Sequence, residues 1–496
     1  MTTPPSLGTR AARGAATTLA AQGAKTVVQL ASVVVLARLL SPHDYGLIAM
    51  VVAIIGIGEI FRDFGLSSAA IQAPELTRQQ RDNLFWINAG IGVALAAIVF
   101  AGAGLLVAAY QQPELLPIAH ALSLTFVFNG LATQYRAGLI RELRFMAIAR
   151  ADVTAPAVAL LVAIGCAIAG WGYWALVWQQ LTQVFVLLVM VAGAARWLPG
   201  RPRRAANMRG LLRFGWNLVA SQLIGYVSNN VDSVLIGLRF GAAPLGLYNR
   251  AFQLLMTPLN QVRSPLTTVA LPVLSKLTDD RRRYEEYVAA GQLALGYTLV
   301  AGLGLVASAA EPTTRLFLGE QWLAVAPVLR LFAIAGIFQT LAFVGYWVYV
   351  SRGLTAELFR YSLVSAAIKI ACVLVGSTWG VLGIAIGYAT APAIAWPISL
   401  WWLSRKADIS TRRLYAGAFR ILALVTAIGG AAAVATFAAA PWGSPAQLAI
   451  AAAITLAGYG LAWLLLSPVR RDVAVVVDMI RRVPRARQSA ERVGRV

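Results

Sequence analysis

The feature that most restricts the fold of this chain is a long series of apolar segments separated by short polar ones. A helix needs about 20 mostly apolar residues to cross the hydrocarbon core of a bilayer, and windows of this kind recur along almost the whole chain. They fall near 15–39, 45–70, 84–110, 115–135, 148–169, 172–195, 211–238, 245–271, 286–310, 325–350, 357–378, 380–403, 414–439 and 446–467. The sequence therefore predicts an all-α polytopic membrane protein with about fourteen transmembrane helices.

The composition and the distribution of charge agree with this class. The chain of 496 residues is 59% hydrophobic and 12% charged, with 42 Lys and Arg against 20 Asp and Glu. Most of the basic residues fall in alternate loops, such as RWLPGRPRRAANMRG and SKLTDDRRRYEE, whereas the opposite loops, such as SPHDYG and PWGSPAQ, carry few. Basic loops stay in the cytoplasm, so both termini are predicted to be cytoplasmic. The net charge of +22 then reflects topology and gives no reason to expect a nucleic-acid partner.

The sequence offers no signature of a cofactor, a metal or a catalytic site. Cys166 and Cys372 lie in separate apolar segments without companion ligands, which is typical of small buried side chains. His43 and His120 stand alone and are interpreted as structural, and no P-loop motif is present. We therefore expect a protein that is not an enzyme and that binds no cofactor or metal.

The chain also contains an internal repeat at an offset of 200 residues. Residues 20–50 align without gaps on 220–250, so that Gln29 lies over Asn229 and Gly46 over Gly246. Both copies would begin on the cytoplasmic side, which indicates a parallel repeat. The predicted domains are a six-helix lobe (1–200), a second six-helix lobe (201–405), an additional helix pair (406–468) and a basic cytoplasmic tail (469–496).

Several charged and polar residues lie inside the predicted spans, many on stripes with helical spacing. A charge at a helix centre costs about 2.5–3.5 kcal/mol on the insertion scale, so these residues are expected to face one another or water. They suggest a hydrated cavity in which cations attract phosphate and amides bind sugar hydroxyls. The candidate cavity residues are Lys25, Gln29, Arg62, Gln222, Asn229, Arg250, Gln253, Asn260, Arg263 and Lys369.

The acidic residues of the spans leave two interpretations open. Glu59, Arg62 and Asp63 have the spacing of a local ion-pair cluster that ties helices together, but Glu59 and Asp63 are also candidates for gating or ion coupling. Asp232 and Arg250 each lie nine residues from Gly241 in the predicted turn, which places them at a similar depth. We expect an Asp232–Arg250 ion pair, with titration of Asp232 as the alternative.

Four segments resemble the bacterial polysaccharide transporter family: LARLLSPHDYGLIAM, DFGLSSAAIQ, LRFGWNLVASQL and SNNVDSVLIGLRFGAAPLGLYNRAFQL. This family comprises the flippases for O-antigen and exopolysaccharide repeat units, within the superfamily that also contains MATE multidrug exporters and lipid II flippases. The resemblance implies two six-helix lobes in a V, two further C-terminal helices, and secondary transport by alternating access.

The resemblance also implies the cargo and the compartment. The cargo would be an undecaprenyl-diphosphate-linked oligosaccharide, moved from the cytoplasmic to the periplasmic leaflet of the bacterial inner membrane. It would serve lipopolysaccharide, exopolysaccharide or capsule assembly, and a polymerase or a chain-length regulator would be a partner. The identity of the coupling ion stays open, because no ion-site motif matches residue by residue.

Other functions remain alternatives at this stage. A lipid II flippase shares the diphosphate of the cargo, and a MATE-type drug exporter shares the fold, although an exporter of cations favours an acidic interior. A membrane-embedded polysaccharide polymerase or sugar transferase belongs to a different class. The few acids of the outer loops, chiefly Asp44, Glu114, Glu311 and Glu320, form no motif that supports such an enzyme.

Overall fold

The computed structural model describes residues 7–63, 67, 70, 76–202, 209–407 and 409–479, and all regular elements in these residues are helices. The chain divides into two compact units, Met1–Arg250 and Ala251–Val496. Unit 1 contains α1 (Leu7–Leu39), α2 (Pro42–Asp63), α4 (Arg78–Tyr110), α5 (Leu115–Arg141), α6 (Phe145–Ile168), α7 (Trp174–Ala195), α8 (Arg209–Phe240) and the start of α9 (Ala242–Lys276). The predicted all-α class is confirmed.

Unit 2 begins within α9 and continues through helices of more varied length. They are α10 (Arg281–Leu295), the π-helix η1 (Gly296–Val300), α11 (Ala301–Ser308), α12 (Ala310–Phe317), the 3-10 turn η2 (Glu320–Val325), α13 (Ala326–Ser351), α14 (Thr355–Gly376), η3 (Ser377–Trp379), α15 (Gly380–Lys406), α16 (Arg412–Ala438), η4 (Ala440–Trp442) and α17 (Ser444–Leu465). A further helical segment follows at residues 467–479.

The number of membrane-crossing helices agrees with the sequence. In the described residues, 11 ranges are long and apolar enough to span a membrane, and one of them, Thr355–Lys406, contains both α14 and α15. Helices α8 and α9 do not reach the same apolar threshold, but they have 32 and 35 residues and therefore sufficient length. With these helices included, the structure has about fourteen potential spans. Many large apolar side chains are exposed, as lipid-facing residues are expected to be, and Phe437 is 85% exposed.

Local sequence signals explain where several helices begin and end. Thr77 accepts a hydrogen bond from the backbone of Gln80, which completes a capping box at the start of α4. At the start of α2, the Asp44 carboxylate accepts hydrogen bonds from both the backbone and the hydroxyl of Ser41. Asp44, an outer-loop acid for which the sequence indicated no role, therefore stabilises the start of α2. Gly241, with a φ of 86°, separates α8 from α9.

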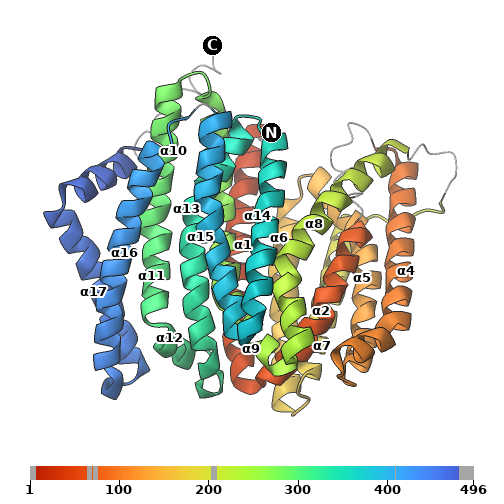
Figure 1. Ribbon diagram of the computed structural model, residues 1–496. Helices are drawn as coiled ribbons and strands as arrows, with labels where there is room; N and C mark the ends of the chain where they lie inside the picture. The colour runs from red at the N-terminus through yellow and green to blue at the C-terminus, as the bar shows by residue number, and fades with distance from the viewer. Residues whose placement is uncertain are drawn as a thin grey trace, which may run out of the picture. The chain divides into compact units, whose positions relative to one another are not determined.

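Within each unit, equivalent neighbours pack together. In unit 1, α7 packs against both α5 and α6, and α4 lies beside α5 (Figure 1). In unit 2, α15 packs against both α13 and α14, and α11 lies beside α13 (Figure 1). Helix α8, which the sequence assigns to the second lobe, packs against α2 within unit 1.

Small residues allow the closest of these contacts. On α14 and α15, a Cβ added to Gly376 would lie 2.2 Å from the Gly383 carbonyl oxygen, and one added to Gly387 would lie 2.2 Å from that of Cys372. Such close backbone approach through small residues is characteristic of helix packing in membranes. Cys372 takes part in this interface through its backbone, because its carbonyl oxygen lies against Gly387.

Candidate functional site

A cavity of about 700 Å³ lies in unit 2 between α9, α13, α14 and α15. The described residues of its walls combine aromatic rings, hydroxyls, amides and one cation, with no acidic residue among them. The lining residues are Asn260, Arg263, Thr267, Thr268, Gln339, Ala342, Phe343, Tyr346, Tyr349, Leu358, Tyr361, Ser362, Ser365, Pro392, Ala395, Trp396 and Ser399. Two of the residues expected from the sequence, Asn260 and Arg263, thus share a cavity of the size that ligand sites have.

Among the described residues of the cavity wall Arg263 is the only charged one, and it is 5% exposed. One terminal nitrogen donates to the Gly336 carbonyl at 3.1 Å and to the Thr340 hydroxyl at 2.6 Å, and the other reaches Gln339 at 3.4 Å. These acceptors are all neutral, and they hold the guanidinium of α9 against α13. Among the described residues Nε has no hydrogen-bond partner. The cation is therefore fixed in position while its charge is not neutralised by a carboxylate.

Lys369 is connected to the same region through Tyr388. The Lys369 ammonium lies 4.7 Å from the centroid of the Tyr388 ring, which is a cation–π distance. The Tyr388 hydroxyl in turn lies 3.5 Å from the amide nitrogen of Gln339, which also contacts Arg263. Gln253 is an exposed residue of α9 that does not line the cavity. Of the four candidate cavity residues in unit 2, Asn260 and Arg263 therefore line the cavity, Lys369 lies beside it, and Gln253 does not line it.

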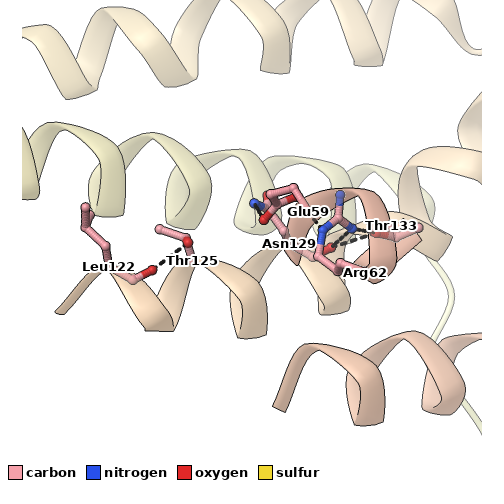
Figure 2. A network of polar contacts seen from close by, with 6 residues as sticks. All are labelled: Glu59, Arg62, Leu122, Thr125, Asn129 and Thr133. Atoms are coloured by element: carbon pink, nitrogen blue, oxygen red, sulfur yellow. Dashed lines mark hydrogen bonds and ion pairs between the residues drawn. The ribbon is translucent and has the colours of Figure 1, made fainter. Parts of the chain in front are cut away.

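In unit 1, Glu59 and Arg62 form a closed polar network with α5 (Figure 2). The Arg62 Nε donates to Glu59 at 2.6 Å, and its NH1 donates to the backbone of Asn129 and to the Thr133 hydroxyl. The Asn129 amide donates to the other Glu59 oxygen at 3.1 Å. The predicted Glu59–Arg62 pair is confirmed, and it ties α2 to α5. The side chain of Asp63 lies outside the described part of the chain.

The expected ion pair between Asp232 and Arg250 is wrong. Asp232 is 1% exposed, and its carboxylate accepts hydrogen bonds from the Tyr248 hydroxyl at 2.6 Å and from the backbone of Ser233 at 3.0 Å. The Arg250 guanidinium is 3.6 Å from the centroid of the Tyr45 ring. The prediction considered only the position of the two residues along their helices, whereas the rotation of α9 about its axis directs Arg250 toward Tyr45 of α2. Neutral hydroxyl and ring contacts replace the predicted pair.

The remaining unit 1 candidates are distributed over two helices. Lys25 and Gln29 are partly exposed residues of α1, which packs against α6. Further along α1, the Ser32 hydroxyl accepts a 2.7 Å hydrogen bond from Gln179 of α7. Gln222 and Asn229 are exposed on α8. The structure places none of these four in the unit 2 cavity.

The sequence did not single out the aromatic residues of the cavity. Each of three helices contributes residues spaced i, i+3, i+4 and i+7: 339, 342, 343 and 346 on α13; 358, 361, 362 and 365 on α14; and 392, 395, 396 and 399 on α15. This spacing places each set on one helical face. A search for stripes that mix aromatic and hydroxyl side chains would have found them, whereas a search for charge could not.

No group of three or more His, Cys, Asp or Glu side chains with metal-binding geometry occurs in the described ranges. The one cation, the hydroxyls and the aromatic faces of the cavity instead suit a ligand that is itself hydroxylated and partly apolar. Fold and cavity together define a polytopic helical membrane protein with an internal cavity lined by polar and aromatic side chains.

Comparison with known proteins gives the family. Residues 35–327 match the polysaccharide biosynthesis protein family, and the chain belongs to this family. It is similar to the lipopolysaccharide biosynthesis protein WzxC of Escherichia coli, with 25% identity over 78% of this chain and 79% of WzxC. It is also similar to the teichuronic acid biosynthesis protein TuaB of Bacillus subtilis, with 26% identity over 75% of this chain and 77% of TuaB.

A third relative and a solved structure complete the comparison. The succinoglycan biosynthesis transport protein ExoT of Rhizobium meliloti is 24% identical over 72% of each chain. The structure of the lipid II flippase MurJ in an inward closed conformation matches with a TM-score of 0.69 and 13% identity, covering 89% of this chain and 98% of that one. The chain therefore has the fold of that flippase and is an integral membrane protein.

Proposed function

We propose that this protein is a flippase that moves undecaprenyl-diphosphate-linked oligosaccharide repeat units across the bacterial inner membrane. Membership of the polysaccharide biosynthesis family supports a cargo that contains sugar. Among its relatives, ExoT is named as a transport protein for succinoglycan biosynthesis. A fold shared with a lipid II flippase supports movement of a lipid-linked glycan rather than catalysis.

The observation that carries the proposal is the unit 2 cavity around Arg263. Its aromatic rings suit the C–H faces of sugars, and its amides and hydroxyls suit sugar hydroxyls. A MATE-type exporter of cationic drugs is less well supported, because the described lining residues include a cation and no acid. A polymerase or sugar transferase is less well supported because the described residues of the cavity lack a general base.

The proposed transport cycle is alternating access between the two membrane faces. The parallel repeat predicted from the sequence, with lobes at 1–200 and 201–405, is part of this proposal. The recurrence of equivalent packing, α5 and α6 on α7 and then α13 and α14 on α15, supports it. The cations Lys25, Arg62, Arg250, Arg263 and Lys369 are proposed to attract the diphosphate or acidic sugars. The amides Gln29, Gln222, Asn229, Gln253 and Asn260 are proposed to exchange hydrogen bonds with sugar hydroxyls, with Asp232, Glu59 and Asp63 as coupling candidates.

The proposed orientation places both termini in the cytoplasm. The basic loops between α7 and α8 and between α9 and α10 support it through the positive-inside bias. Polysaccharide polymerases and chain-length regulators are proposed as partners, since they consume the cargo after it reaches the outer leaflet.

The function is tested by reconstitution. Purified protein in liposomes receives a fluorescent undecaprenyl-diphosphate-linked oligosaccharide, and the fraction accessible to an external glycosidase is followed with time. We expect accessibility to increase with the protein and to remain near the lipid-only level with a heat-inactivated control. Equal rates with and without the protein, under a proton or a sodium gradient, would exclude flippase activity. Faster transport of lipid II than of the oligosaccharide would favour the lipid II alternative.

A further inference from the structure

We propose that the unit 2 cavity is a subsite for a sugar ring that carries a carboxylate, with Arg263 binding the carboxylate and Phe343 and Tyr346 stacking against the ring. The inference rests on the proposed function, since it assigns one chemical group of the same cargo to one place in the chain. It distinguishes this subsite from any that binds the diphosphate.

The positive charge of Arg263 has no carboxylate partner among the described residues of the cavity. Its side chain is 95% buried, its hydrogen-bond acceptors are neutral, and its Nε has no partner among the described residues. Burial of a charge without a counterion is costly, and cavities that retain such a charge commonly receive an anion. The neutral acceptors on α13 hold the guanidinium in place, so an arriving anion would not have to order it.

The second argument is the aromatic surface beside that charge. Phe343 and Tyr346 on α13 stack with ring centroids 6.1 Å apart and planes inclined by 20°. Tyr346 is 41% exposed, and the Arg263 guanidinium carbon lies 5.6 Å from the Phe343 ring. An aromatic surface close to a fixed cation suits a sugar ring that has an apolar C–H face and a carboxylate at its edge.

The third argument is the supply of neutral polar groups around the ring position. Asn260 presents an exposed amide, and Ser365 a partly exposed hydroxyl, both in the cavity wall. The indole Nε1 of Trp396 is buried without a hydrogen-bond partner among the described residues. These groups can donate to and accept from sugar hydroxyls, and a hydroxylated ligand would satisfy the indole donor.

The charge balance favours a carboxylate over the diphosphate. A diphosphate carries at least two negative charges, and one guanidinium in a wall whose other described residues are neutral would leave much of that charge without a counterion. A single carboxylate matches the single cation and can accept the parallel hydrogen bonds that a guanidinium provides. The cavity volume of about 700 Å³ has room for a sugar ring with neighbours, within the ~300–1,000 Å³ range of ligand sites.

The test measures binding of soluble compounds to the purified full-length protein by calorimetry. The three compounds are a trisaccharide with one glucuronic acid, the same trisaccharide with that carboxylate reduced to the alcohol, and inorganic diphosphate. We expect the acidic trisaccharide to bind on the order of tenfold or more tightly than the reduced one. Arg263→Gln should abolish this preference, and Tyr346→Ala should weaken both trisaccharides. Arg330→Gln is the matched control, because Arg330 is a cation of α13 outside the cavity wall.

Several outcomes would overturn the inference: equal binding of the two trisaccharides, an unchanged preference in Arg263→Gln, or diphosphate that displaces the acidic trisaccharide from wild type but not from Arg263→Gln. If Arg263→Gln fails to fold, Arg263→Lys, which should reduce the preference because it loses the parallel hydrogen bonds, and the cavity-wall variant Tyr346→Ala supply the comparison. Failure of the proposed function is seen separately. A protein that binds the acidic trisaccharide as described but flips no lipid-linked oligosaccharide refutes the transport proposal and leaves the subsite standing.

Discussion

The hydroxyl of Tyr248 donates a 2.6 Å hydrogen bond to the carboxylate of Asp232, and both side chains are 1% exposed. The bond joins α9 to α8 across the turn at Gly241. Two residues beyond Tyr248, the guanidinium of Arg250 stacks on Tyr45 of α2. A tyrosine therefore contacts each of the two charged residues around this turn, and the carboxylate also accepts a hydrogen bond from the backbone of Ser233.

This arrangement predicts unequal effects for two conservative variants. Tyr248→Phe removes the hydroxyl donor and leaves one oxygen of a buried carboxylate without it, which should lower the free energy of unfolding by about 1–3 kcal/mol. Asp232→Asn keeps an oxygen that can still accept from Tyr248, so its effect should be smaller. Thermal unfolding of the purified variants, followed by tryptophan fluorescence, measures both.

The same pair of variants distinguishes a structural from a gating role for Asp232. If Asp232 is structural, Asp232→Asn should retain flipping and its dependence on pH in liposomes. A variant that is as stable as wild type but has lost the pH dependence would instead identify Asp232 as a titrating group of the cycle.

The next prediction concerns the close approach of the first turns of α2 and α9. A Cβ on Gly46 would lie 1.7 Å from the carbonyl oxygen of Ala242, and a Cβ on Gly246 would lie 1.8 Å from that of Pro42. Both obstacles are backbone atoms, which cannot rotate away. Gly46→Ala or Gly246→Ala should therefore separate the two turns and cost about 1–3 kcal/mol through overpacking.

Gly225 of α8 provides the matched control, because a Cβ there meets nothing within 4 Å. Gly225→Ala should leave the melting temperature and polysaccharide export near wild type. Cysteine cross-linking between positions 43 and 243 measures the separation directly. Undiminished cross-linking in Gly46→Ala would mean that the turns tolerate the methyl group and that this contact does not limit their approach.

The sequence predicted some of these features and could not predict others. Apolar periodicity and charge located the spans: helix α7 (Trp174–Ala195), for example, lies within the predicted window 172–195. Alignment of the repeat paired Gly46 with Gly246, which the structure brings into contact. The position of a residue along a helix does not give the rotation of that helix about its axis. The sequence therefore predicted an ion pair between Asp232 and Arg250, whereas Asp232 contacts Tyr248 and Arg250 contacts Tyr45. The stripe that each helix contributes to the cavity is visible in the sequence, but the packing that brings the stripes of several helices around one cavity is not.

The Glu59–Arg62 network gives a prediction that tests pairwise coupling. Glu59→Gln and Arg62→Gln each leave part of a half-buried network unsatisfied, since Asn129 and Thr133 of α5 depend on the same groups. A double-mutant cycle should give a coupling free energy of about 0.5–3 kcal/mol between them. The exchanged pair, Glu59→Arg with Arg62→Glu, should restore only part of the stability, because the contacts to α5 depend on which position holds the guanidinium. Additive single effects would show that the two residues act independently.

The last prediction concerns the helical segment at 467–479, which follows α17. Its Asp472 is 6% exposed, and the carboxylate accepts two hydrogen bonds from Arg420 of α16, at 2.7 and 3.0 Å, and one from the Tyr297 hydroxyl of η1 at 3.0 Å. A bidentate guanidinium–carboxylate contact with a third donor is among the stronger polar contacts that a protein forms. It fixes this segment to the additional helix pair and to the π-helical turn.

Asp472→Asn should weaken this attachment by about 1.5–3 kcal/mol, the range for hydrogen bonds to charged groups, while leaving the spans intact. Backbone amides of residues 467–479 should then exchange with deuterium at least tenfold faster, with little change in α16 itself. Arg413→Gln, which removes an exposed cation near the start of α16, is the control and should leave the exchange unchanged. Equal protection of the segment in Asp472→Asn and wild type would mean that its apolar valines, rather than the carboxylate, hold it in place.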